Sequence, residues 1–208
     1  MIAIIDYGVG NLFSLQCSFA KIGAEAVVTS DVEVIEKADR LILPGVGAFE
    51  DAAKKLRQSG LDQVILRETA KGKPLLGICL GMQMLFEKSY EYGEHEGLSL
   101  IPGSIRPIPT EEGADLKIPH IGWNQLHFCG QKDELFRYLK EGDFVYFVHS
   151  YYGTDCKEAT IATTEYGTEL TAAVRAGSVW GCQFHPEKSG NVGLAILKAF
   201  CEVSSASG

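Results

Sequence analysis

The sequence has no long apolar run and no excess of basic residues. Its apolar stretches fall far short of the roughly 18 residues that a membrane-spanning helix needs, which argues against a membrane protein. The 19 Lys and Arg residues against 27 Asp and Glu give a net charge of −8, and the basic residues are not clustered as phosphate binding requires. We therefore expect a cytoplasmic protein that binds neither nucleic acid nor a membrane.

Closely spaced cysteines are also missing, since none of the six cysteines forms a C-x-x-C pair. This spacing argues against a zinc ribbon and a redox-active dithiol, so we predict no metal site and no cofactor. In a reducing compartment most cysteines are small buried hydrophobic residues, and a reactive one must be identified by its neighbours. The six are Cys17, Cys79, Cys129, Cys156, Cys182 and Cys201.

Length and composition are those of one ordinary globular domain. The chain has 208 residues, of which 46% are hydrophobic and 22% charged, and domains commonly contain roughly 100 to 200 residues. Neither an internal repeat nor a low-complexity linker divides the sequence. We expect a single domain over residues 1–203, followed by a frayed tail of small residues at 204–208.

The pattern of apolar residues predicts an α/β fold. In the first half, short apolar runs alternate with amphipathic stretches, which is typical of parallel strands covered by helices on both faces. Strands are predicted at residues 1–6, 25–29, 40–44 and 74–78, and helices at 12–22, 48–59, 61–71 and 80–88. Apolar runs at 144–148, 159–164, 171–175 and 179–184 predict hairpins that extend the sheet, before a closing helix at 191–203. We expect a doubly wound, mostly parallel, flavodoxin-like sheet with an antiparallel extension in the second half.

The segment Gly77-Ile78-Cys79-Leu80-Gly81 lies where a predicted strand passes into a helix. A nucleophile elbow needs this arrangement, because its central residue sits on a tight turn and the flanking glycines let strand and helix approach. The start of a helix also favours a thiolate over a thiol. We predict that Cys79 is a nucleophile; the alternative is a buried cysteine at a glycine-rich strand end.

A thiol nucleophile needs a base, and the base needs an orienting group. His185 ends an apolar run and is followed by Pro186 and Glu187. In an extended segment residues two apart project to the same side, so Glu187 can accept a hydrogen bond from one ring nitrogen of His185. We predict a triad of Cys79, His185 and Glu187, and leave four histidines without a catalytic role: His95, His120, His127 and His149.

Acyl chemistry also requires hydrogen-bond donors for an oxyanion, each worth about 3 to 4 kcal/mol. The backbone amide of Leu80, directly after the nucleophile, is one candidate. The glycine-rich turn Pro44-Gly45-Val46-Gly47 follows the third predicted strand and supplies the second, through the amide of Val46. An ordinary strand-to-helix turn would have the same composition.

Two other classes of protein compete with this interpretation. The run DYGVGN at residues 6–11 follows the first strand and resembles a dinucleotide phosphate loop, but Phe13 stands where the third glycine belongs. A non-enzymatic binding module of flavodoxin-like topology is the other alternative. It leaves both the cysteine elbow and the His-x-Glu motif unexplained.

Taken together, these residues resemble the class-I, triad-type glutamine amidotransferases, whose motifs are G-x-C-x-G-x-Q and a distant H-P-E. Both are present, at residues 77–83 and 185–187. The sequence is more narrowly similar to the glutaminase subunits of imidazole glycerol phosphate synthases, through DYGVGN at 6–11, PGVGAF at 44–49 and PHIGWN at 119–124. Val46 stands where other members usually have glycine, which favours this group over pyridoxal phosphate or anthranilate systems.

The resemblance implies hydrolysis of L-glutamine through a γ-glutamyl thioester on Cys79. His185 would give a proton to departing ammonia and then take one from water. Substrate contacts are implied at Gly47, at Gln83 and at the backbone of Ser150 and Tyr151.

The resemblance further implies a heterodimer with a (β/α)8-barrel cyclase, which uses the ammonia to form imidazole glycerol phosphate and AICAR in histidine biosynthesis. We expect Asn11, Trp123 and Lys188 to lie on the docking surface, because tryptophan is frequent at interface hot spots and Lys188 follows Glu187. We also expect the isolated subunit to be nearly inactive until the nucleotide-loaded cyclase binds. Val46 is expected to take part in this switch from the inactive to the active state.

Overall fold

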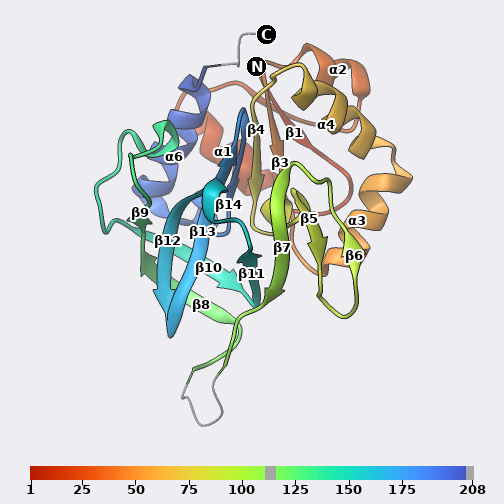
Figure 1. Cartoon of the computed structure of the whole chain (residues 1–208). Helices are drawn as coiled ribbons and strands as arrows, with labels where there is room; N and C mark the ends of the chain where they lie inside the picture. The colour runs from red at the N-terminus through yellow and green to blue at the C-terminus, as the bar shows by residue number, and fades with distance from the viewer. Residues whose placement is uncertain (111–115, 205–208) are drawn as a thin grey trace.

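The computed structural model describes residues 1–110 and 116–204, and an eight-stranded sheet runs through its centre (Figure 1). The sheet is mixed, as expected from the two halves of the sequence. Five neighbouring strands are parallel, in the order β2 (Ala26–Thr29), β1 (Ile2–Ile5), β3 (Arg40–Leu43), β4 (Leu75–Ile78) and β14 (Val179–Cys182). Three antiparallel strands extend it, namely β13 (Thr168–Ala176), β12 (Thr160–Tyr166) and β9 (His127–Phe128).

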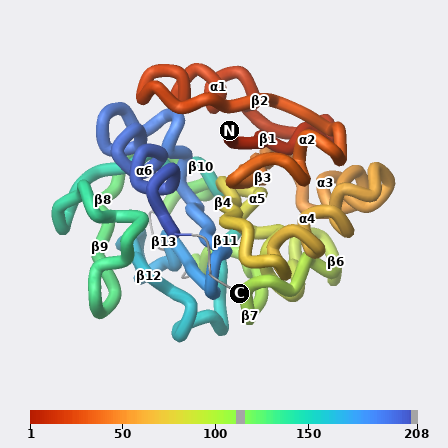
Figure 2. Tube along the Cα trace, turned by 90° about the horizontal axis from the view of Figure 1, so that it is seen from above, coloured from red at the N-terminus to blue at the C-terminus, as the bar shows by residue number. Residues whose placement is uncertain are grey.

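Helices cover both faces of the parallel part of the sheet, as the view along the strands in Figure 2 shows. On one face lie α1 (Leu12–Lys21) and α6 (Gly190–Glu202), which contact each other. On the other lie α2 (Val32–Lys37), α3 (Phe49–Gln58), α4 (Leu61–Ala70) and the short α5 (Leu80–Met84). Two-sided cover explains why the parallel strands are continuous apolar runs rather than alternating ones.

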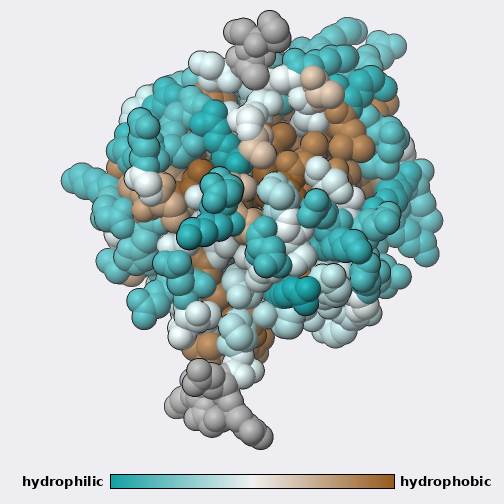
Figure 3. All heavy atoms as spheres, in the orientation of Figure 1, coloured by the Kyte–Doolittle hydropathy of each residue, from teal (hydrophilic) through white to brown (hydrophobic). Residues whose placement is uncertain are grey.

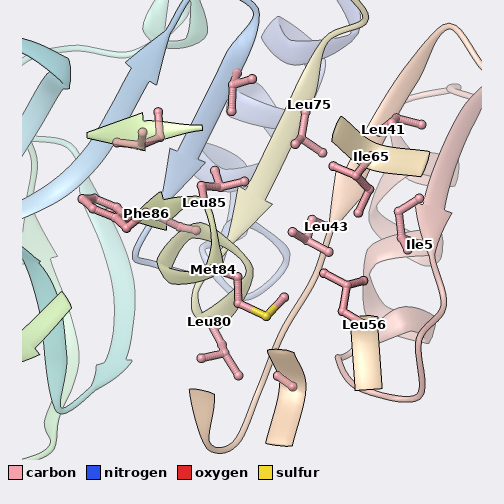
Figure 4. Packing of buried hydrophobic residues seen from close by; sticks show 14 of the residues in the cluster. Ile5, Leu41, Leu43, Leu56, Ile65, Leu75, Leu80, Met84, Leu85 and Phe86 are labelled. Carbon is pink, nitrogen blue, oxygen red and sulfur yellow. The ribbon is translucent and has the colours of Figure 1, made fainter. Parts of the chain in front are cut away.

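The parallel strands β1 and β3 contribute alternate side chains to two separate cores. In β1, Ile2 and Ile4 pack toward α1 and α6, whereas Ala3 and Ile5 pack toward α2, α3 and α4. Figure 4 shows the second of these cores, where strand residues meet side chains from α3 and α4. Leu80 belongs to the same core, so the first residue of α5 is anchored by its side chain just after the predicted nucleophile.

Two smaller sheets complete the part of the fold that the structure describes. One has four strands in the order β11 (Tyr151–Thr154), β7 (Ile101–Pro107), β5 (Phe86–Ser89) and β6 (His95–Glu96). The other is an antiparallel pair, β8 (His120–Gln125) and β10 (Phe144–His149). Among residues 1–110 and 116–204, three single-turn 3-10 helices connect elements: η1 (Glu134–Phe136), η2 (Lys157–Ala159) and η3 (Pro186–Lys188).

Three predictions about elements were wrong or incomplete. The helix predicted at 80–88 ends at Met84, because the following residues pair with β7 as strand β5. The run at 144–148 forms β10 of the separate pair and does not extend the central sheet. The helix α2 was not predicted; it begins after Asp31, whose side chain accepts the amide of Glu33 at 2.8 Å. Of the tail predicted to fray at 204–208, residues 205–208 lie outside the described residues.

The surface is mainly polar on the side drawn in Figure 3, where hydrophobic residues gather in the upper centre, around the position of β4 in Figure 1. None of the described helices is long and apolar enough to cross a bilayer. The described residues also hold no cluster of three or more His, Cys, Asp or Glu side chains arranged to bind a metal ion.

Candidate active site

Cys79 lies in a strained turn between β4 and α5. Its backbone angles are φ 54° and ψ −112°, a conformation rare outside glycine. Its amide donates to the carbonyl of Cys182 at 2.7 Å, which ties the turn to β14. The flanking glycines are needed for space, since a Cβ on Gly81 would clash with the Leu43 carbonyl and one on Gly77 would lie 2.7 Å from the Gly81 carbonyl oxygen. The geometry is that of a nucleophile elbow.

His185 follows β14 and is almost completely buried. Its Nδ1 lies 2.8 Å from Oε1 of Glu187, and its backbone amide donates to the Tyr146 carbonyl at 3.0 Å. The predicted pairing is present, but its backbone differs from the expected extended segment. Glu187 belongs to the 3-10 turn η3, and Pro186 at its first position sets the turn that brings the carboxylate to Nδ1 of the ring.

The pKa of His185 is raised to about 9. Burial acts to lower it, but hydrogen bonds to Cys79 and Glu187 and the negative charges of both residues outweigh that penalty. His185 is therefore an imidazolium at neutral pH, which is the form that can donate a proton to a leaving group.

A pocket of 420 Å³ opens in front of Cys79, at the carboxyl ends of β3, β4 and β14. This edge is where open parallel sheets bind their ligands. Glu187 lies behind His185 rather than in the pocket wall. The predicted site residues that line it are Val46, Gly47, Cys79, Leu80, Gln83, Ser150, Tyr151, His185 and Lys188.

The turn before α3 presents a free backbone amide at the pocket. Gly47 has φ +91°, whereas Val46 stays out of the left-handed region and is 43% exposed. Within residues 1–110 and 116–204 no group accepts the amide of Val46, and that of Leu80 is at the first position of α5, where helices leave donors unpaired. Both predicted oxyanion donors are thus available at the same pocket.

Gln83, one helical turn after Cys79, is buried in the pocket wall. Its side-chain nitrogen donates to the Tyr151 carbonyl and to Oε1 of Gln183, both at 3.1 Å. Gln183 in turn lies 3.8 Å from the Cys79 sulfur. The sequence analysis did not identify Gln183, although its position two residues before His185 at the end of an apolar run was a usable signal.

Glu91 is a second pocket residue that the sequence analysis missed. Its carboxylate lines the pocket and accepts the backbone amide of Phe49 at 2.6 Å. Glu91 follows β5 and lies beyond the helix predicted at 80–88, and no spacing rule pointed to it. It gives the pocket a negative group away from the thiol.

His149 also lines the pocket but is engaged elsewhere. Its Nδ1 donates to the Tyr151 carbonyl at 2.8 Å, and its Nε2 lies 3.0 Å from Nδ1 of His120. Burial lowers the pKa of His149 to about 4, so it is uncharged at neutral pH. This environment suits a structural histidine better than a general base.

Of the three residues predicted to dock a partner, only Lys188 is part of the lining of this pocket. Lys188 is exposed and lines the pocket, while Asn11 is half-buried in front of α1. Trp123 is 52% exposed and belongs to strand β8, not to a loop. It shares one face of the β8 and β10 pair with Ile121 and Phe144, which are also exposed, so that face is apolar and uncovered.

Known structures share this fold at low sequence identity. A crystal structure of a glutamine amidotransferase matches with a TM-score of 0.74 and 20% identity, over 97% of this chain and 98% of that one. The glutaminase domain of a Trypanosoma brucei CTPS with bound acivicin matches with a TM-score of 0.65 and 16% identity, over 98% and 94% of the two chains.

Sequence comparisons are more specific. Residues 3–203 match the family Glutamine amidotransferase class-I. The imidazole glycerol phosphate synthase subunit HisH of Lactococcus lactis is 51% identical, over 97% of this chain and 98% of the relative. The protein of the same name from Methanothermobacter thermautotrophicus is 48% identical, over 98% of both. The chain therefore belongs to the class-I glutamine amidotransferases, within the HisH subunits of imidazole glycerol phosphate synthase.

Proposed function

We propose that this chain hydrolyses L-glutamine to glutamate and ammonia and passes the ammonia to a cyclase subunit in histidine biosynthesis. The observation that carries the proposal is the convergence, at one pocket, of a thiol on a strained elbow, an imidazole paired with a buried carboxylate and two free backbone amides. Nucleophile, acid-base group and oxyanion donors are the parts that acyl transfer from an amide requires.

Acylation begins when the Cys79 sulfur attacks the γ-carbonyl carbon of glutamine. The carbonyl electron pair moves to oxygen, and the amides of Leu80 and Val46 stabilise the resulting oxyanion. When the C–N bond breaks, the imidazolium of His185 donates its proton to the departing nitrogen, which leaves as ammonia. The product on the protein is a γ-glutamyl thioester.

Deacylation reverses the role of the histidine. Neutral His185 takes a proton from water as the oxygen attacks the thioester carbon, and the C–S bond then breaks to release glutamate and the thiolate. Glu187 accepts a hydrogen bond from Nδ1 throughout, which leaves Nε2 as the reacting nitrogen and stabilises the imidazolium.

The pocket wall supplies groups for the amino-acid end of glutamine. We assign the α-ammonium group to Glu91, because its carboxylate is the negatively charged group of the pocket wall apart from the catalytic residues. Gly47, Gln83 and the backbone of Ser150 and Tyr151 complete the substrate contacts, since all four residues line the same pocket.

Ammonia is protonated in bulk water and then cannot act as a nucleophile, so its acceptor must be close. We propose that a (β/α)8-barrel cyclase docks on the apolar face of β8 and β10, with Trp123 at its centre, and reaches Asn11 and Lys188. Support comes from the exposure of Trp123, Ile121 and Phe144 on one face and from the position of Lys188 at the pocket. The six cysteines are free thiols, which suits the cytoplasm as the location.

Glutamate release from glutamine, measured with and without a purified cyclase subunit loaded with its nucleotide, tests the proposal. We expect turnover that rises strongly when the cyclase is added. Absence of glutamate under both conditions would contradict the enzymatic activity, whereas turnover that ignores the cyclase would contradict the partnership alone.

A further inference from the structure

The loop after β1 supports the turn that carries the amide of Val46. The hydroxyl of Tyr7 donates to the Pro44 carbonyl at 2.6 Å, and only 6% of Tyr7 is exposed. Gly10 lies against the same proline, since a Cβ on Gly10 would come within 2.8 Å of the Pro44 Cβ. The DYGVGN motif at residues 6–11 therefore contacts the turn after β3, in place of the phosphate contacts of a dinucleotide loop.

The turn between β3 and α3 is held by hydrogen bonds at its two ends, whereas the backbone amide in its middle is not. Tyr7 binds the Pro44 carbonyl at the first end, and Glu91 accepts the amide of Phe49 at the second. Gly45 is pressed against the elbow, because a Cβ there would lie 2.7 Å from the Gly81 nitrogen. Between these anchors the Val46 amide has no acceptor in the part of the chain that the structure describes.

A bond to the Pro44 carbonyl has a direct consequence for the Val46 amide. The carbonyl belongs to the peptide plane between Pro44 and Gly45, and the next plane contains the Val46 N–H. Only the φ and ψ angles of Gly45 separate the two planes, and glycine restricts these angles least of all residues. Without the Tyr7 bond the first plane could rotate, and the second would turn with it.

Tyr7 is suited to act as a permanent donor. Burial raises the pKa of its hydroxyl far above the ordinary value, and the nearby charge of Cys79 raises it further, so the proton stays on oxygen at every working pH. The ring is buried in the same hydrophobic core as Leu43 and Leu80, which restricts the position of the hydroxyl. Tyr7 does not line the glutamine pocket.

We propose that Tyr7 is a positioning residue for glutamine hydrolysis, whose hydroxyl fixes the Pro44 carbonyl and thereby aims the Val46 amide at the oxyanion. The inference rests on the proposed function of the pocket and adds a residue to it. Its effect falls on the transition state, because the oxyanion forms only there. Substrate binding and the reactivity of the thiol itself do not depend on it.

Tyr7→Phe removes the hydroxyl and keeps the ring. In the complex with nucleotide-loaded cyclase we expect kcat to fall about tenfold or more, with KM for glutamine unchanged within about twofold, since loss of an oxyanion donor costs about 100-fold or more. Alkylation of Cys79 by iodoacetamide should keep its wild-type rate, because displacement at a saturated carbon forms no oxyanion. The matched control is Tyr166→Phe, which removes a hydroxyl that donates to the Lys117 carbonyl, also at 2.6 Å, and should leave both rates unchanged.

The Tyr7→Phe experiment distinguishes failure of this inference from failure of the proposed glutaminase activity. A Tyr7→Phe variant with wild-type kcat, beside an active wild type, would overturn the inference alone. A rise in KM at constant kcat, or an equal loss of alkylation and turnover, would overturn it too, because either result means that Tyr7 only packs the site. A wild type that does not hydrolyse glutamine in the complex would overturn the proposed function and the inference with it.

Discussion

His185 and Glu187 are joined through a 3-10 turn, with Nδ1 of the imidazole 2.8 Å from Oε1 of the carboxylate. The side chains are 3% and 1% exposed, so water scarcely screens the pair. The other carboxylate oxygen, Oε2, is buried without a hydrogen-bond partner in the described residues. The charge of Glu187 is therefore directed at a single neighbour, and together with the interactions of Cys79 it keeps the pKa of the buried imidazole raised.

Replacement of Glu187 by glutamine should lower both the pKa of His185 and the rate. An amide carries no charge to stabilise the imidazolium, and it can offer N–H to Nδ1 and so select the wrong tautomer. We expect kcat to fall by about two orders of magnitude or more, and the pKa of His185, followed by NMR of the labelled imidazole, to fall below the wild-type value. Glu141→Gln is the matched control, since Glu141 pairs with His127 at 3.0 Å on the surface. Equal titration of His185 in wild type and Glu187→Gln would contradict the assignment.

The raised pKa of His185 predicts a pH dependence of stability. The folded protein holds this proton up to about pH 9, whereas the unfolded chain loses it near the ordinary value of about 6.5. The bound proton of His185 contributes fully to the free energy of unfolding below about pH 6.5, and this contribution is lost as pH rises to about 9. The free energy of unfolding should therefore decrease across that window. Urea unfolding at several pH values measures it. His185→Asn should remove this part of the slope, and an unchanged slope in that variant would contradict the prediction.

Cys79→Ala should abolish glutamine hydrolysis without unfolding the protein, because it removes the nucleophile and adds no bulk in the tight elbow. In complex with the cyclase, the variant should still form product when ammonium is supplied at high pH, where free ammonia is abundant. Glutamate release and product formation from each nitrogen source are the measurements. Glutamine turnover by the variant would show that another group attacks the amide.

The sequence predicted the elbow, the pairing of His185 with Glu187 and the parallel strands because each depends on residues close together in the chain. Gly77, Cys79 and Gly81 shape one turn, and His185 and Glu187 share another. Glu91 and Tyr7 escaped notice because their partners, the amide of Phe49 and the carbonyl of Pro44, are backbone groups 42 and 37 residues away.

The error at residues 85–88 has a related cause. An apolar residue at Phe86 fits either a helix or a strand, and the choice was made by pairing with β7, a contact that local periodicity does not record. The separate pairing of β8 and β10 was missed for the same reason, and with it the exposed apolar face that carries Trp123.

Trp123→Ala should weaken binding of the cyclase and leave the fold unchanged. Half of the side chain is exposed in this chain, so its removal leaves no core cavity, whereas a buried interface tryptophan often contributes 2 kcal/mol or more, roughly a 30-fold change in affinity. Titration calorimetry of the two purified subunits measures the loss. Tyr138→Ala, which removes an aromatic of similar exposure beside Lys198, should bind normally. Equal affinity of wild type and Trp123→Ala would place the interface elsewhere.

Contacts from the docked partner should control the orientation of the oxyanion donor at Val46. Val46 stays out of the left-handed region, and a β-branched residue resists entering it far more than glycine does. Tyr7 fixes only the peptide plane before Gly45, so aiming the Val46 amide at the oxyanion still requires rotation about ψ of Gly45 and φ of Val46. That rotation costs more with valine than with glycine at position 46, and contacts from the loaded cyclase must offset the cost. The side chain is 43% exposed at the mouth of the pocket, so it does not simply pack against a helix, and a docked partner can reach it.

Val46→Gly lowers the free-energy cost of turning the backbone amide at position 46 toward the oxyanion in the isolated subunit. We expect the variant to hydrolyse glutamine faster than wild type when each is alone, and to be stimulated less by the loaded cyclase. Initial rates of glutamate release for both proteins, alone and in complex, give the two stimulation ratios. Gly47 lies next to Val46 and already has a positive φ, so Gly47→Ala is the opposing variant and should be slow even in the complex. A wild-type subunit that is fully active alone would refute the switch, since no cost would then remain for the partner to offset.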